Sequence, residues 1–153
     1  MKKILQIIIG IIALGFIVVI VKNTLFTSAD NRFYDDGWTA YEKGDFNTAI
    51  FYFEKIDKTK YPDVYVGLGS SYMNTEDFDN AIQNFQEAYK KNVGKGTEDY
   101  NKVRNSLGYC YLQIGDYKNA RFYFQEAIKS GSSNSKKNIQ IIDSLEPTQN
   151  KIR

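Results

Sequence analysis

The pattern of hydrophobic and polar residues changes character near residue 30 of this 153-residue chain. From Ile4 to Val21, eighteen residues carry no charge and only one amide, that of Gln6. A helix of this length spans roughly 27 Å, close to the roughly 30 Å thickness of a bilayer's hydrocarbon core. After residue 30, apolar residues instead recur at helical spacing among polar ones, which is typical of helices with one buried face. The pattern therefore predicts an apolar helix followed by a helical domain.

Two interpretations of the apolar segment are open. An uncleaved membrane anchor is favoured, because the run is longer than the roughly 7 to 15 residues of a secretory signal and because Lys22 directly follows it. The alternative is a secreted protein that is cleaved near Ala29. Since Lys2 and Lys3 outnumber Lys22 beside the span, we expect a single-pass protein with its helical domain outside the cytoplasm, at a cell envelope.

A block of glycine, alanine and phenylalanine occurs three times after residue 30. The alanine follows the glycine by twelve residues, and the phenylalanine follows the alanine by four. The blocks are Gly37, Ala49, Phe53; Gly69, Ala81, Phe85; and Gly108, Ala120, Phe124. A turn signal divides each block into two helical stretches: Gly44-Asp45-Phe46, Glu76-Asp77-Phe78 and Gly115-Asp116-Tyr117. A single pair of such helices cannot bury its apolar stripe alone, so the pairs are expected to stack on one another.

The small residues of each block have a packing role in this interpretation. The glycines let the two helices of a pair approach closely, and the alanines keep the second helix narrow where it crosses the first. The phenylalanines are expected to fill the space between pairs.

These residues resemble the tetratricopeptide repeat family. The second unit matches the family pattern at Tyr65, Leu68, Gly69, Tyr72, Ala81, Phe85 and Ala88, and the third at Leu107, Gly108, Tyr111, Ala120, Phe124 and Ala127. The third unit has Arg104 at the leading aromatic position, and the first has Asp36, Ala40 and Ile56 where the pattern has leucine, tyrosine and alanine. The resemblance implies an all-α fold: a right-handed α-solenoid of three helix-turn-helix repeats with a C-terminal capping helix, preceded by one transmembrane helix.

The expected organisation is a transmembrane anchor at 1–22, a linker at 23–30, a repeat domain at 31–146 and a tail at 147–153. The units cover about 31–62, 63–95 and 101–132. A capping helix at 135–146 follows Ser130-Gly131-Ser132-Ser133, which breaks the third unit's second helix, and Pro147 is expected to end it. The insertion near 92–99 is expected to be a longer surface connection, with a functional loop as the alternative.

Charge and composition exclude several function classes. Residues 1–29 hold three lysines and no acid, so the rest of the chain carries 17 basic and 18 acidic groups, a net charge of −1. This balance disfavours nucleic-acid binding. The chain has no histidine, no phosphate-binding glycine loop and no calcium-loop spacing, and its one cysteine, Cys110, is expected to be a small buried apolar residue. We therefore expect a non-enzyme with no cofactor, no metal and no small-molecule substrate.

The resemblance implies a concave groove lined by the first helix of each unit. The residues expected to face it are Tyr34, Trp38 and Tyr41; Val66, Ser70 and Met73; and Asn105, Tyr109 and Leu112. Some family members hold a peptide carboxylate with a clamp of lysine and asparagine. Tyr34, Trp38, Val66 and Ser70 offer no such pattern, which disfavours a receptor for chaperone tails. Trp38 with its two tyrosines has two open interpretations, plain core or a binding surface.

These observations predict a membrane-anchored adaptor that binds a peptide or partner protein through an aromatic concave groove. Tethering would keep the groove close to the bilayer, because the connection to the span is only about nine residues, at most about 30 Å long. The alternative is a structural or assembly subunit of a membrane or cell-envelope complex, with no free peptide site.

Overall fold

The computed structural model describes residues 2–25 and 29–149. Within these residues it contains eight α-helices and no strands, as the sequence predicted for an α-solenoid. The helices are α1 (Lys2–Leu25), α2 (Ala29–Glu42), α3 (Phe46–Glu54), α4 (Val64–Asn74), α5 (Phe78–Lys90), α6 (Glu98–Gln113), α7 (Tyr117–Lys129) and α8 (Asn134–Gln149). The expected linker therefore contains helical residues at both of its ends. Its residues 26–28 lie outside the described part of the chain, as do residues 150–153 of the expected tail.

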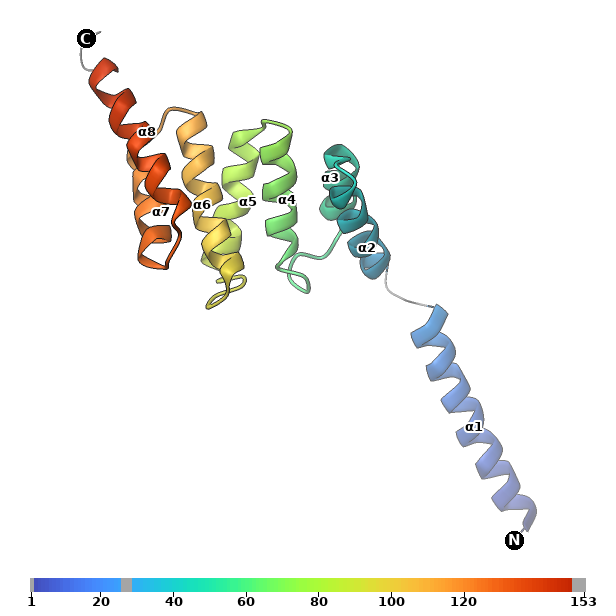
Figure 1. Ribbon diagram of the computed structural model, residues 1–153. Coiled ribbons are helices and arrows are strands. Elements are labelled where there is room, and N and C mark those ends of the chain that lie inside the picture. Colours follow the sequence, from blue (N-terminus) through green and yellow to red (C-terminus); the bar gives the residue numbers. More distant parts are fainter. Residues whose placement is uncertain (1, 26–28, 150–153) are drawn as a thin grey trace.

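Helices α2 to α8 stand side by side in chain order, and α1 lies apart beyond α2 (Figure 1). Contacts join each helix of the row to its neighbours, and further contacts join α2 to α4, α4 to α6 and α6 to α8, whereas the described part of α1 contacts no other helix. Over the residues described here, none of the helices combines the length and the apolar character that crossing a membrane requires. The membrane span expected at 1–22 therefore remains a prediction.

The same tight turn joins the two helices of every pair, as the turn signals predicted. An aspartate caps each second helix, and its carboxylate accepts a hydrogen bond from the backbone N–H three residues later. The residue before each aspartate has a left-handed backbone: φ is 77° at Gly44, 62° at Glu76 and 78° at Gly115. Glycine adopts this conformation freely, so Glu76 is the strained member of the set.

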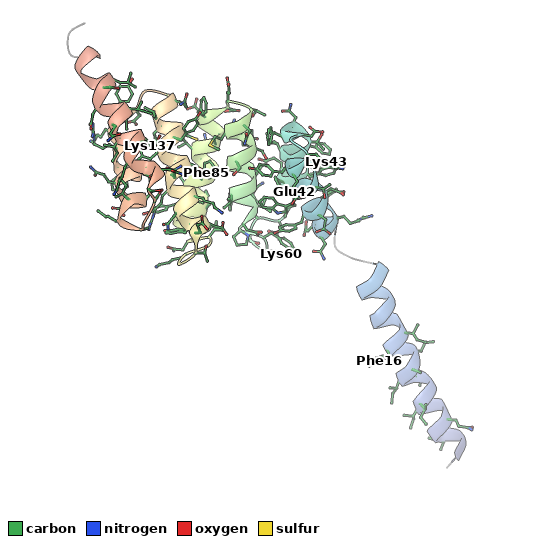
Figure 2. All side chains as sticks on the ribbon, in the orientation of Figure 1. Phe16, Glu42, Lys43, Lys60, Phe85 and Lys137 are labelled. Carbon is green, nitrogen blue, oxygen red and sulfur yellow. The ribbon has the colours of Figure 1, made fainter. Side chains whose placement is uncertain are left out.

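Each repeated phenylalanine packs against the repeated glycine of its own pair. A Cβ added to the glycine would lie 2.6 Å from Phe53 at Gly37, 2.7 Å from Phe85 at Gly69, and 2.6 Å from Phe124 at Gly108. The rings therefore lie inside the pairs rather than only between them, which corrects the sequence-based expectation. Phe53 also reaches the next pair, because a Cβ at Gly67 would lie 2.7 Å from the same ring. Figure 2 shows Phe85 inside the row of helices and Phe16 on the separate α1.

The core joins successive units, as predicted for a stack. Each buried cluster contains residues from the second helix of one unit and the first helix of the next. The clusters include Phe53 with Val64 and Leu68, Phe85 with Val103 and Leu107, and Phe124 with Ile142.

One departure of the first unit from the repeat pattern, Asp36, lies on the exposed face of α2, whereas Ala40 and Ile56 are buried in the core. At three positions of α2 the side chains are exposed. The residues at the equivalent positions of α4 and α6 are buried against the preceding pair of helices. Arg32, Asp36 and Thr39 correspond to Val64, Leu68 and Ser71, and to Val103, Leu107 and Cys110. Because no helix of the row precedes α2, a polar face is favoured there.

The last helix, α8, behaves as the first helix of an incomplete fourth unit. Gln140 follows Gly108 by the same 32 residues that separate Gly37 from Gly69. Ser135 and Ile142 are fully buried on the side of α8 that packs on the third unit. The helix continues past Pro147 to Gln149, so the expected stop at Pro147 is wrong. A proline removes a single N–H donor, and near the end of a helix this loss is small.

The insertion after α5 forms a compact turn and lengthens the next helix. The backbone is left-handed at Asn92, Gly94 and Gly96, and the Thr97 side chain caps α6. Helix α6 begins at Glu98, before the start near 101 that the sequence suggested.

Candidate partner-binding hollow

An open hollow of about 1590 Å³ lies across the first helices of the three units. Helices α2 and α4 supply one side, and the loop at 93–97 with the first half of α6 supplies the other. The loop at 130–134 closes the end nearest α8. We call this space the hollow.

Most of the residues predicted to face a groove line the hollow. They are Trp38 and Tyr41 on α2, Val66, Ser70 and Met73 on α4, and Asn105 on α6. Tyr34, Tyr109 and Leu112 are not among its lining residues. The hollow meets α6 along its first half, because the inserted loop and the loop at 130–134 build their walls there. Tyr109 and Leu112 lie further along the helix.

The three remaining predicted residues have other neighbours. Tyr34 does not line the hollow, but its hydroxyl donates a hydrogen bond to Asp63, which does. Tyr109 is 40% exposed, and its ring centroid lies 6.3 Å from that of Phe78. Leu112 packs against the core cluster around Phe124 and α8.

Trp38 combines the two roles that the sequence left open. Its ring meets those of Phe53 and Tyr41 edge to face, with centroid separations of 5.1 and 5.8 Å. It is half-buried and packs on the first core cluster while also lining the hollow. Its indole N–H is buried and has no hydrogen-bond acceptor of ordinary geometry. The same N–H lies close enough to the Tyr34 hydroxyl to favour its ionised form, which lowers the Tyr34 pKa as a lesser effect. Burial, followed by the hydrogen bond to Asp63, outweighs this effect and raises the Tyr34 pKa to about 12.

Arg104 is a feature of the hollow that the groove prediction missed. Its guanidinium lies 4.5 Å from the centre of the Tyr100 ring, which stacks on Tyr89 at 5.4 Å. One terminal nitrogen donates hydrogen bonds to Asn101 and Ser130, while its Nε is buried without an acceptor. The sequence does carry a signal for it, because an arginine stands at the leading aromatic position of the third unit, where it departs from the repeat pattern.

The loop at 93–97 was also missed as a wall of the site. It contributes Lys95, which makes no ion pair within the described residues. The neighbouring Lys102 lies 3.0 Å from Asp99, so this pair is neutralised. The α6 side of the hollow therefore holds two unpaired cations, Lys95 and Arg104, against one unpaired acid, Glu98. The expected apolar groove is thus mainly apolar on its α2 and α4 side, where Asp63 is the one charged residue among the described lining residues.

The one thiol of the chain does not line the hollow. Cys110 is fully buried, and burial raises the pKa of its thiol to about 12, which keeps it protonated. Among the residues described, no group of three or more metal-ligating side chains has the proximity to hold an ion.

Comparison with known proteins supports the repeat interpretation. No curated protein matches the chain. Residues 66–135, which include most of the second unit and all of the third, match the sequence profile of the family described as tetratricopeptide repeat. Repeats of this kind generally mediate interactions between proteins, and the match therefore supports an interaction role for this stack of helical pairs.

Proposed function

We propose that this chain is a non-enzymatic adaptor that binds a protein or peptide partner in the hollow. One observation carries the proposal: aromatic and aliphatic side chains from successive first helices converge on a single open space. Trp38 and Tyr41 face it from α2, and Val66 and Met73 face it from α4. Aromatic side chains in a concave, partly apolar site are typical anchors of protein recognition.

Photocrosslinking in cells tests this role. A photoreactive phenylalanine derivative replaces Tyr41, which lines the hollow, and in a matched variant it replaces Gln83, which is exposed on α5 outside the hollow. We expect a discrete set of protein adducts from position 41 that position 83 does not give. Identical adducts from both positions, or none from position 41, would contradict the proposal. Adducts that form only from α1 would favour the assembly-subunit alternative.

The second part of the proposal is that α1 attaches the adaptor to a membrane with the repeats outside the cytoplasm. The uncharged run from Ile4 to Val21 supports it. So does the outward exposure of apolar side chains around the helix, with Ile9 on one side, Ile11 and Leu14 on the other, and each more than half exposed. A helix with this surface requires an apolar environment.

Cell fractionation tests the attachment. We expect the full chain to remain with membranes after a high-pH wash, and a variant with Ile9→Arg and Ile12→Arg to move to the soluble fraction. Lys43→Gln, on the exposed end of the first pair, is the matched control and should not move. A mature protein that begins at Asp30 would instead establish cleavage, and protection of the repeats from protease added outside the cytoplasmic membrane would reverse the proposed orientation.

A further inference from the structure

The two sides of the hollow differ in chemistry. The α2 and α4 side presents Trp38, Tyr41 and Met73, whereas the α6 side presents Arg104 and Lys95. A partner that fills the hollow therefore meets a mainly apolar surface at one end, and at the other two unpaired cations with one unpaired acid, Glu98.

The positive end is poorly neutralised by the chain itself. Arg104 makes no ion pair within the described residues. The pKa of Glu126 is lowered mainly by its hydrogen bond to Lys129, and the positive charge of Arg104 lowers it further by a smaller amount. Its Nε is buried without an acceptor. Buried or half-buried guanidinium groups ordinarily pair with an anion, so this one lacks its usual complement.

The start of α8, at the same end of the stack, adds further positive charge. Helix α8 begins beside the hollow at Asn134 with no acidic residue in its first turn. It carries Lys136 and Lys137 there instead, both exposed and without an ion pair among the described residues. Lysines at a helix N-terminus are opposed by the helix dipole, and their presence raises the local positive potential further.

The charge of the whole row follows the same direction. Residues 30–100 carry 8 basic and 14 acidic groups, a net of −6, and the described residues from 101 to 149 carry 7 and 4, a net of +3. Because the helices lie in chain order, this difference runs along the row, with Glu42 on α2 near one end and Lys137 on α8 near the other (Figure 2). Such a polarised surface orients a charged partner.

We propose that the hollow takes an extended acidic protein segment in one direction, with an apolar side chain against Trp38 and Met73 and its carboxylates beside Arg104 and Lys95. This inference rests on the proposed function, and it names the partner's chemistry and orientation. Charge complementarity selects the occupant, since the hollow's unpaired charges at that end are mainly positive. The carboxylates act at Arg104 and Lys95, and not at Tyr34, Trp38, Val66 and Ser70, where the clamp pattern is absent.

Trp38 is the only tryptophan of the chain and lies in the hollow, so its fluorescence reports occupancy. The full chain in detergent is titrated with short tryptophan-free peptides that carry one leucine followed by a run of glutamates. Control peptides carry glutamines or lysines in place of the glutamates. We expect the glutamate peptide to bind about tenfold more tightly than the glutamine peptide at low salt, and the difference to shrink as salt screens it.

Charge-removing variants locate the effect. Arg104→Gln and, separately, Lys95→Gln should each reduce the preference for glutamate severalfold, and the exposed Lys118→Gln on α7 is the matched control that should keep it. Lys95 lies on a loop, so its variant remains informative if Arg104→Gln unfolds the third unit. Equal affinity for the glutamate and glutamine peptides, or an unchanged preference in Lys95→Gln, would overturn the charge assignment while leaving the hollow as a binding site.

Two further outcomes separate the alternatives. Failure of every peptide to change the fluorescence of Trp38 would count against the hollow as a peptide site and so against the proposed function itself. Complete displacement of the glutamate peptide by an equal concentration of inorganic phosphate would overturn the carboxylate assignment and indicate a phosphorylated partner.

Discussion

The left-handed Glu76 provides a direct test of how the repeat turns are built. Its φ is 62°, whereas glycine occupies the equivalent position in the other two turns, at Gly44 and Gly115. A non-glycine residue in this conformation costs roughly 1–2 kcal/mol. Glycine offsets part of the gain, because it increases the entropy of the unfolded chain by roughly 0.4–1 kcal/mol. Glu76→Gly should therefore stabilise the fold by about 0.5–1 kcal/mol, which raises the melting temperature by about 2–4 °C.

Urea unfolding followed by circular dichroism measures this effect. The Glu76 side chain is exposed and makes no hydrogen bond or ion pair within the described residues, so its removal costs no contact. Glu76→Ala is the control that distinguishes the backbone effect from the loss of charge, because it removes the carboxylate and retains the left-handed non-glycine residue. We expect little change in the free energy of unfolding for this variant. The reciprocal variant Gly44→Ala should lower the stability by about 1 kcal/mol. A Glu76→Gly variant that unfolds at lower urea than the parent would refute the reasoning.

Three other predictions follow from the core and the caps. Ala81→Leu should cost about 1–3 kcal/mol, since Ala81 has no exposed surface and lies in a packed cluster; an unchanged melting temperature would contradict this packing. Asp77→Ala should cost about 1 kcal/mol by removing the cap of α5, and Asp79→Ala beside it is the matched control in the same denaturation assay. The Tyr34 pKa is raised to about 12, above the unfolded value near 10, so only the folded state keeps this proton between the two values. Stability should therefore fall as the pH rises above about 10, with a smaller fall in Tyr34→Phe when urea midpoints are compared.

The helical stack could be predicted because its signals are local and repeated. Identical spacing of glycine, alanine and phenylalanine fixed the phase of the units, and the turn signals located each pair's loop at the aspartate that caps the second helix. Asp36 in place of a leucine weakened the match of the first unit. The structure gives the reason, since this position lies on a face that no earlier helix of the row covers. The handedness of the solenoid stays a prediction.

The hollow was predicted only in part, because its walls depend on loops. Position within the repeat placed Trp38, Val66 and Asn105 on the groove side of their helices, and all three line the hollow. It carried no information about the inserted loop, which shifts the hollow toward the first half of α6 and away from Tyr109. The repeat pattern also did not show that Arg104 lies over Tyr100, which stacks on Tyr89. Tyr100 belongs to the extra turn at the start of α6 that follows the insertion.

Contacts in the row reach only a short distance along the chain, so among the described residues no contact joins the first unit to the last. The helices at the two ends have support on one side only, and they are expected to open before α4 to α6 when the stack loosens. The hollow alone reaches from α2 to the start of α8. A partner bound in it would contact the first and last units at the same time, although these units do not contact each other. Binding would therefore slow amide hydrogen exchange at both ends together.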